Sequence, residues 1–292
     1  MEPWRMYPGR IVGDRRLPVA AGLFYEDRPE ALRAQLEWAK GHPLGPGEGG
    51  LGEPGGRVVG IVAPHGSLYY SGPIVLHAVL VAAPVKPGLV VVVGPNHSGL
   101  GARVSVYPRG FWSTPVGDVE VDEGASRLLA ERGGFELDYQ GHVYEHSVEV
   151  LLPVLLHVLG GGWRLVAVSL YDHSPGTASR LSEALAELAS SRDDVLVVFS
   201  ANLSGFGEPD EVRRWDELLL SRLLKGDAEG LYRVVEEEGI PTCSLGVLAS
   251  AVLYASKLSA SMRLLKHALS SDVAGGGTAV GYAAISLAKT SG

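Results

Sequence analysis

Short, fully apolar runs dominate the chain from residue 58 onward and alternate with stretches of helical periodicity. The runs are VVGIVA (58–63), LVVVVG (89–94), RLVAVSL (164–170) and DVLVVFSA (194–201). β-Branched residues dominate most of them and no polar face shows, which is typical of strands buried on both sides in a parallel sheet. Helices are predicted between the runs, over residues 73–83, 123–132, 147–159, 177–190, 211–225, 228–238 and 245–258. This alternation predicts an α/β fold, a three-layer α/β/α sandwich with a mostly parallel or mixed central sheet.

The two ends of the chain extend this pattern. PEALRAQLEWAK (29–40) is predicted to be a helix, with Leu32, Leu36 and Ala39 on one side. RLLKHALS (263–270) and AVGYAAISLA (279–288) are typical of closing strands. Residues 41–57 contain 8 glycines and 3 prolines, which indicates a loop. No linker follows Arg57, so we expect a single domain over residues 1–292, with an N-terminal extension at 1–16 and the loop at 41–57.

Charge and composition exclude several classes of protein. The 292 residues carry a formal net charge of −8 and no lysine/arginine run, which argues against nucleic-acid binding. Uncharged apolar runs of about 10 residues are too short to span a bilayer. The N-terminus, MEPWRMYPGR, lacks the apolar core of a signal peptide. The single cysteine, Cys243, excludes an internal disulfide and fits a reducing cytosol. We therefore expect a cytoplasmic protein that binds neither nucleic acid nor a membrane.

Two histidines directly follow two of the predicted strands. His65 lies in GIVAPHGSLYYSG (60–72) and His97 in VVVVGPNHSG (90–99), each preceded by proline within two residues. Ligands of such sheets bind at the carboxyl ends of the strands. Two imidazoles from neighbouring strand ends can bind one metal ion, whereas a lone histidine there is usually only a surface residue. The pair therefore favours a shared metal site.

Cys243, in GIPTCSLG (239–246), is the third candidate ligand. An isolated cysteine is more often a small buried hydrophobe. This one, however, stands just before a predicted helix, whose positive N-terminal end favours a thiolate. A set of two histidines and one cysteine leaves open coordination positions on zinc, iron or copper, and does not choose among them.

Two further motifs are weaker. HVYEH (142–146) matches the H-x-x-E-H spacing of inverted zinc proteases, which requires both histidines on one helical face. The helix is expected to begin near His146 or Ser147, so His142 would miss that face, and a structural or pocket-lining role for Glu145 and His146 is favoured. GEGGLG (47–52) fits G-x-G-x-x-G but follows no strand and opens no helix, so we interpret it as part of the loop.

Several segments in order resemble the Memo family (mediator of cell motility). They are RLPVAAGLFY (16–25), APHGSLYYSG (63–72), GPNHSG (94–99), FWSTPVGDVEVD (111–122), YEHSVEVLLPVL (144–155), Cys243 with its helix, and VGYAAI (280–285). The family is similar in fold to class III extradiol dioxygenases, which hold non-haem iron. The resemblance implies His65, His97 and Cys243 as metal ligands. It implies a pocket at the same edge, and we expect the residues lining it to be Glu145, His146, Asn202, Ser67 and Tyr70.

The sequence also departs from the family pattern. The usual S-S-D-L-S-H-Y-G segment is SANLSGFG (200–207) here, so Asn202 replaces an aspartate and Gly205 replaces the histidine that matches the acid/base of the dioxygenases. General acid–base help of about 10²–10⁴-fold is therefore missing at that place. We assign no catalytic residue and expect no ring cleavage. His142 and His146 remain candidates for a substitute base.

Three hypotheses follow. The first is a metal-binding protein of dioxygenase-like fold that lacks ring-opening activity. The second is a non-catalytic binding module that serves a radical-SAM or AMMECR1-like partner, as the prokaryotic AmmeMemoRadiSam resemblance implies. The third is a non-haem oxygenase or oxidase that acts on a small phenolic substrate. Whether the protein is an enzyme, and its oligomeric state, are left open.

Overall fold

The computed structural model describes residues 11–12, 14–48 and 56–289. At its centre is an eight-stranded sheet in the order β11-β12-β3-β10-β4-β9-β5-β8. The four predicted apolar runs form the neighbouring parallel strands β3, β10, β4 and β9. β12 runs antiparallel to β3 and β11, and β5 runs antiparallel to β9 but parallel to β8, so the sheet is mixed. The strands are β3 (Arg57–Ala63), β4 (Leu89–Pro95), β5 (Val104–Val106), β8 (Glu136–Leu137), β9 (Arg164–Leu170), β10 (Val195–Ser200), β11 (Ala260–Leu269) and β12 (Gly281–Lys289).

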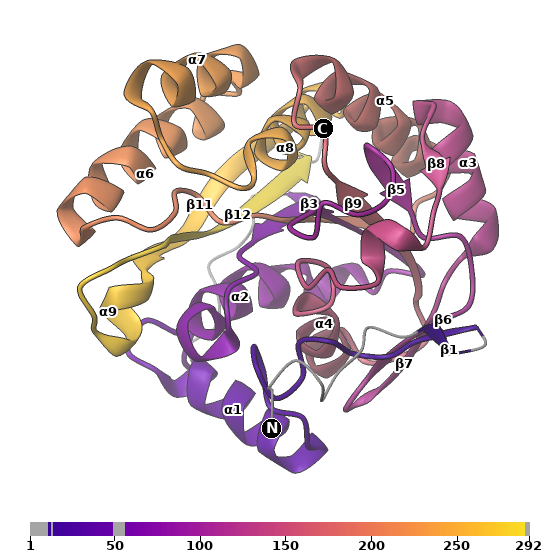
Figure 1. The fold of residues 1–292 in the computed structure, drawn as a ribbon, viewed down its shortest axis with the longest axis horizontal. Coiled ribbons are helices and arrows are strands. Elements are labelled where there is room, and N and C mark those ends of the chain that lie inside the picture. The colour runs from indigo at the N-terminus through magenta and orange to yellow at the C-terminus, as the bar shows by residue number, and fades with distance from the viewer. Residues whose placement is uncertain (1–10, 13, 49–55, 290–292) are drawn as a thin grey trace.

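Helices cover both faces of this sheet (Figure 1). One layer contains α1 (Pro29–Gly41), α2 (Leu68–Ala82), α4 (Leu151–Leu159) and the short α9 (Ser270–Ala274). The other contains α3 (Glu123–Gly133), α5 (Pro175–Ser191), α6 (Pro209–Leu224), α7 (Ala228–Glu238) and α8 (Leu245–Lys257). The predicted three-layer α/β/α sandwich is therefore confirmed.

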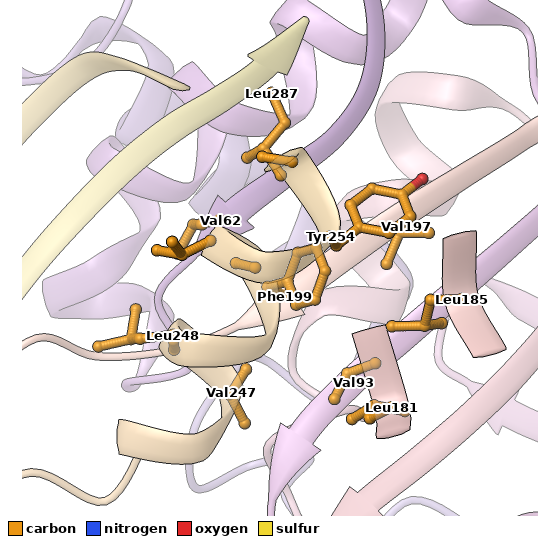
Figure 2. Packing of buried hydrophobic residues seen from close by; sticks show 14 of the residues in the cluster. Val62, Val93, Leu181, Leu185, Val197, Phe199, Val247, Leu248, Tyr254 and Leu287 are labelled. Atoms are coloured by element: carbon orange, nitrogen blue, oxygen red, sulfur yellow. The ribbon is translucent and has the colours of Figure 1, made fainter. Parts of the chain in front are cut away.

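Alternate residues of the central strands enter two separate cores. In β4, Val91 and Val93 pack with the α5 and α8 layer, whereas Val90 and Val92 pack with the α2 and α4 layer. Figure 2 shows the first core, where Phe199 of β10 lies among side chains of α8 and α5. Burial of each such valine or leucine contributes about 1.5–3 kcal/mol. Because both strand faces are buried, the sequence of these runs shows no polar alternation.

The helix predicted over 73–83 begins earlier, at Leu68, and contains Pro73 in its interior. Proline usually occupies the first turn of a helix, which is why the prediction began there. Instead the Ser67 carbonyl accepts hydrogen bonds from the backbone N–H groups of Tyr70 and Ser71, and these bonds open the helix one turn sooner. The earlier start places the segment after His65 directly at a helix N-terminus.

The sequence suggested that uncharged apolar runs are about 10 residues long, which is too short to span a bilayer. This helix and the turn after it form a longer run. The stretch Leu68–Val85 has 18 residues and is long and apolar enough, by length and composition, to cross a membrane. It is 67% buried inside the protein, between the sheet, α1 and α4. Such burial is equally typical of the core helix of a globular fold, so the stretch is weak evidence for a membrane span.

A second, small sheet was not predicted. It has the order β1-β2-β6-β7, formed by Ile11–Val12, Arg15–Arg16, Phe111–Thr114 and Gly117–Glu120. Part of the predicted N-terminal extension thus belongs to this sheet, while residues 1–10 lie outside the described residues. Of the predicted loop at 41–57, residues 49–55 also lie outside them, and the single-domain organisation stays a prediction.

An ion pair fixes this small sheet to the rest of the protein. The Arg16 side chain is 1% exposed and that of Glu149 is 0% exposed, and Nη1 lies 2.6 Å from Oε2. The same guanidinium donates to the Glu145 carbonyl (2.6 Å) and the His142 carbonyl (2.8 Å), and it lies 4.1 Å from the centroid of the Trp112 ring. Arg16 therefore holds the backbone of residues 142–149 from the side of the small sheet.

Glu149 is equally well satisfied. Its carboxylate accepts hydrogen bonds from the Tyr25 hydroxyl (2.7 Å) and the backbone N–H groups of Val19 and Ala20. Even with these donors, the buried carboxylate depends on its cationic partner, because removal of one member of a buried ion pair is strongly destabilising.

We expect Arg16→Ala to lower the free energy of unfolding by about 3–5 kcal/mol, because it leaves the Glu149 carboxylate buried without a counter-charge. The neighbouring Arg15→Ala is a matched control. Arg15 pairs with Asp118 on the surface, where its side chain is 45% exposed, so its loss costs about 0–1 kcal/mol. Urea unfolding of the two variants measures the difference, and equal midpoints would contradict the structural role of Arg16.

Candidate metal centre

The orientation of His65 is set by a serine behind it. His65 follows β3 and is 1% exposed, and its Nδ1 lies 3.1 Å from the Ser200 hydroxyl at the end of β10. That hydroxyl donates its only hydrogen to the Ser147 carbonyl (2.6 Å), so it accepts from His65. His65 therefore carries a proton on Nδ1, and Nε2 is the only ring nitrogen that can bind a metal ion.

A buried carboxylate does the same for His97. His97 Nδ1 lies 2.9 Å from Oε1 of Glu145. The same oxygen accepts the backbone N–H groups of His146 and Ser147, and Oε2 accepts the backbone N–H of His97. Burial would raise the pKa of Glu145, but the hydrogen bond and charge of His97 lower it to about 2. The carboxylate is thus ionised and accepts the Nδ1 proton of His97, so Nε2 is the nitrogen that can bind a metal ion once its own proton is released. This carboxylate–histidine arrangement is typical of metal-binding histidines.

His146 completes a cluster of three imidazoles. Its ring lies between those of Phe24 and His97, with centroid distances of 4.4 Å and 4.6 Å. Burial lowers the pKa of His146 to about 3, so the ring is neutral, as a metal ligand must be. Ligand nitrogens of His65, His97 and His146 lie within 4.8 Å of one another, a spacing that can hold a metal ion. We had expected His146 to line the pocket; the structure places it among the candidate ligands.

Cys243 lies beside this cluster, just before α8. Its Sγ is 3.6 Å from Nε2 of His65 and 3.3 Å from the hydroxyl of Ser244. Burial would raise the pKa of this thiol, but hydrogen bonds with His65 and His97 lower it to about 5, which favours the thiolate. Burial would lower the pKa of His97, whereas Cys243 and Glu145 raise it to about 10. The sulfur is near enough to His65 to take part in the site, and its role as a ligand stays a prediction.

The other predicted pocket residues lie around the cluster. The Asn202 side-chain oxygen accepts the His65 backbone N–H (3.1 Å), and the Ser67 hydroxyl donates to the carbonyl of Phe24 (3.1 Å). Asn202 thus fixes the backbone of His65, and Ser67 fixes that of Phe24, whose ring packs against His146. Tyr70 is 38% exposed at the start of α2, with its ring against that of Tyr69.

Gly205 supplies no side chain to this edge of the sheet. Its backbone N–H donates to the carbonyl of Pro241 (2.6 Å). A Cβ built at Gly205 would meet only that carbonyl oxygen, at 3.4 Å.

His142 is not part of the site. Its Nε2 lies 3.0 Å from the carbonyl of Ser105, and its ring packs against Tyr107 and Trp112. It precedes the helix that begins at Leu151, so His142 and His146 do not share a helical face. The expectation that His142 would miss the helical face, which argued against an inverted protease, is therefore confirmed. His142 is also too deeply buried to act as a substitute base.

One histidine near the site escaped the sequence prediction. His173 follows β9 in RLVAVSLYDHS, and the N–H of Gly246, in the first turn of α8, donates to its Nδ1 (3.1 Å). The signal was present, since an apolar run followed within three residues by histidine is the pattern that singled out His65 and His97.

Comparison with known proteins places the chain in a family. The family model of the Memo-like protein matches residues 16–286. The chain belongs to the Memo family. It is 36% identical over 277 residues to a MEMO1 family protein of Desulfurococcus amylolyticus, which is 93% of this chain and 98% of that protein. It is 37% identical over 276 residues to a MEMO1 family protein of Methanopyrus kandleri, which is 92% of this chain and 98% of that protein. The resemblance seen in the sequence is confirmed.

In the metal-free protein, we expect Nδ1 of His65 to carry a proton, because the Ser200 hydroxyl can only accept from it. Long-range ¹H–¹⁵N correlation spectra of the imidazole rings report this directly. Ser200→Ala removes the acceptor and should abolish the preference. Ser182→Ala, whose hydroxyl bonds to the Ser179 carbonyl within α5, should leave the His65 signals unchanged. An Nε2–H tautomer in the wild type would contradict this assignment.

Proposed function

We propose that this Memo-family protein binds an iron, copper or zinc ion at the carboxyl edge of its sheet. His65 and His97 are ligands through Nε2, and Cys243 and His146 complete the set. The observation that carries the proposal is the orientation of the first two rings. Each has its Nδ1 proton held by an outer partner, Ser200 or Glu145, which leaves Nε2 as the nitrogen of each ring that can bind a metal ion, and the two rings belong to one cluster.

The donor chemistry supports this choice of metals. Imidazole nitrogens with a thiolate suit zinc, copper and iron, whereas magnesium and calcium prefer oxygen ligands. The neutral ring of His146 and the low pKa of the Cys243 thiol supply ligands in the protonation state that binds metal. When bound, such an ion supplies Lewis-acid or redox chemistry. This chain's residues hold the ligand rings in position, and Asn202 fixes the backbone of His65.

We do not propose ring cleavage. Gly205 offers no group that can take a proton, and the side-chain oxygen of Asn202 is engaged by the backbone of His65. The proposed function is therefore metal binding at a dioxygenase-like site, without the proton transfer that a ring-opening reaction requires.

We expect protein purified anaerobically to bind about one metal ion per chain. His65→Ala and His97→Ala should each lower the metal affinity by more than the roughly 10- to 100-fold that loss of an outer-shell partner costs. Elemental analysis and competition with a chromogenic chelator measure the effect. His157→Ala, at a partly exposed position of α4 where the histidine lies near Glu37, is the matched control. If the wild type and His65→Ala retain the same negligible amount of metal, the proposal fails.

The role of Cys243 has a separate test. Cobalt(II) bound by the wild type should show a thiolate-to-metal charge-transfer band, and Cys243→Ser should lose that band while the three histidines remain. Zinc affinity of the variant should fall at the same time. Identical cobalt spectra for the wild type and Cys243→Ser would exclude the sulfur as a ligand and leave a site made of histidines alone.

A further inference from the structure

His173 lies at the same sheet edge as the metal centre. In the parallel pair β4 and β9, Pro95 lies opposite Leu170, and the N–H of Asn96 donates to the Leu170 carbonyl (2.8 Å). His97 is two residues beyond this last pair on β4, and His173 is three residues beyond it on β9. The two histidines thus leave the sheet together, from neighbouring strands.

The first turn of α8, which begins just after Cys243, fixes the His173 ring. Gly246 follows Cys243 by three residues, and its N–H donates to His173 Nδ1 (3.1 Å). A Cβ at Gly246 would lie only 2.8 Å from Cα and 2.9 Å from Nδ1 of His173, so this close approach requires glycine. The Tyr232 hydroxyl also donates to the His173 carbonyl (2.9 Å), which holds the backbone from α7. The ring is therefore held in place before any ligand arrives.

The hydrogen bond from Gly246 also determines the tautomer. A backbone N–H can only donate, so Nδ1 of His173 is the acceptor and the proton is on Nε2. Among the described residues, this Nε2–H has no hydrogen-bond acceptor, and it is not among the buried polar atoms that lack a partner. It is thus an accessible donor without a protein acceptor.

The surroundings keep this donor neutral. Burial lowers the pKa of His173, and the charge of Cys243 opposes that effect more strongly than the charge of Asp172, its neighbour in sequence. Among the charged groups that raise the pKa of His173, the sulfur of the proposed centre therefore has the largest effect.

We propose that His173 donates a hydrogen bond from Nε2–H to a small anionic or oxygen-donor ligand that occupies the open side of the metal centre. This inference rests on the proposed function, because the ligand needs the metal. It gives His173 a role in ligand binding and none in holding the ion itself.

The test uses the cobalt(II)-loaded full chain and azide as the probe. His173→Asn keeps an acceptor at the place of Nδ1 but loses the outer donor, whereas the amide nitrogen of His173→Gln reaches the place of Nε2. We expect azide affinity, followed by the visible cobalt spectrum, to be roughly 3- to 10-fold weaker in His173→Asn, the effect of one net hydrogen bond. His173→Gln should remain within about 2-fold of the wild type. Cobalt affinity should be equal in all three proteins.

The outcomes separate the two proposals. If the three proteins bind cobalt equally and azide equally, the role of His173 is overturned while the metal centre stands. If His173→Asn loses cobalt as well, His173 serves the ion and the inference is also overturned. If the wild type binds no cobalt, the metal centre itself fails, and the inference fails with it.

Discussion

A guanidinium and a carboxylate, those of Arg16 and Glu149, meet inside this protein with almost no access to water. Neither can be buried alone, since each isolated charge would cost several kcal/mol. The pair therefore forces the segment before α1 and the segment before α4 to pack together. The second of these segments also carries Glu145 and His146, whose backbone Arg16 holds through the Glu145 carbonyl. The geometry of the candidate centre thus depends on a contact made by a residue of the small sheet.

Hydrogen bonds connect this ion pair to the histidines of the candidate centre. Glu145 orients His97, while Ser200 on the neighbouring strand orients His65 and is itself oriented by the Ser147 carbonyl. Residues 145–147 therefore set both rings, one through a side chain and the other through a backbone oxygen. Outer partners of this kind fix the tautomer of metal-binding histidines and raise their basicity. The site is built as one network across β3, β4, β10 and the segment before α4.

Much of this arrangement was predictable because the central strands are buried on both faces. Their unbroken apolar runs identified the sheet, and the residues just after them, His65 and His97, identified its functional edge. The sequence could not reveal Arg16, because an arginine in a charged segment looks like a surface residue until its partner, 133 positions away, is known. The start of α2 was missed because Pro73 imitates a first-turn proline. The ligand position of His146 depends on ring packing with Phe24, which no local periodicity encodes.

The space around Gly205 determines which substitutions this edge of the sheet can accept. Its backbone is held by the Pro241 carbonyl rather than collapsed into the pocket, and a Cβ there would make only one ordinary contact. Apart from that oxygen, no neighbouring atom lies within 4 Å of the place that a Cβ would occupy. A residue with a Cβ can therefore be accommodated at position 205 without a shift of the loop backbone. In engineering terms, position 205 is a place at which a side chain can be added near the candidate metal centre.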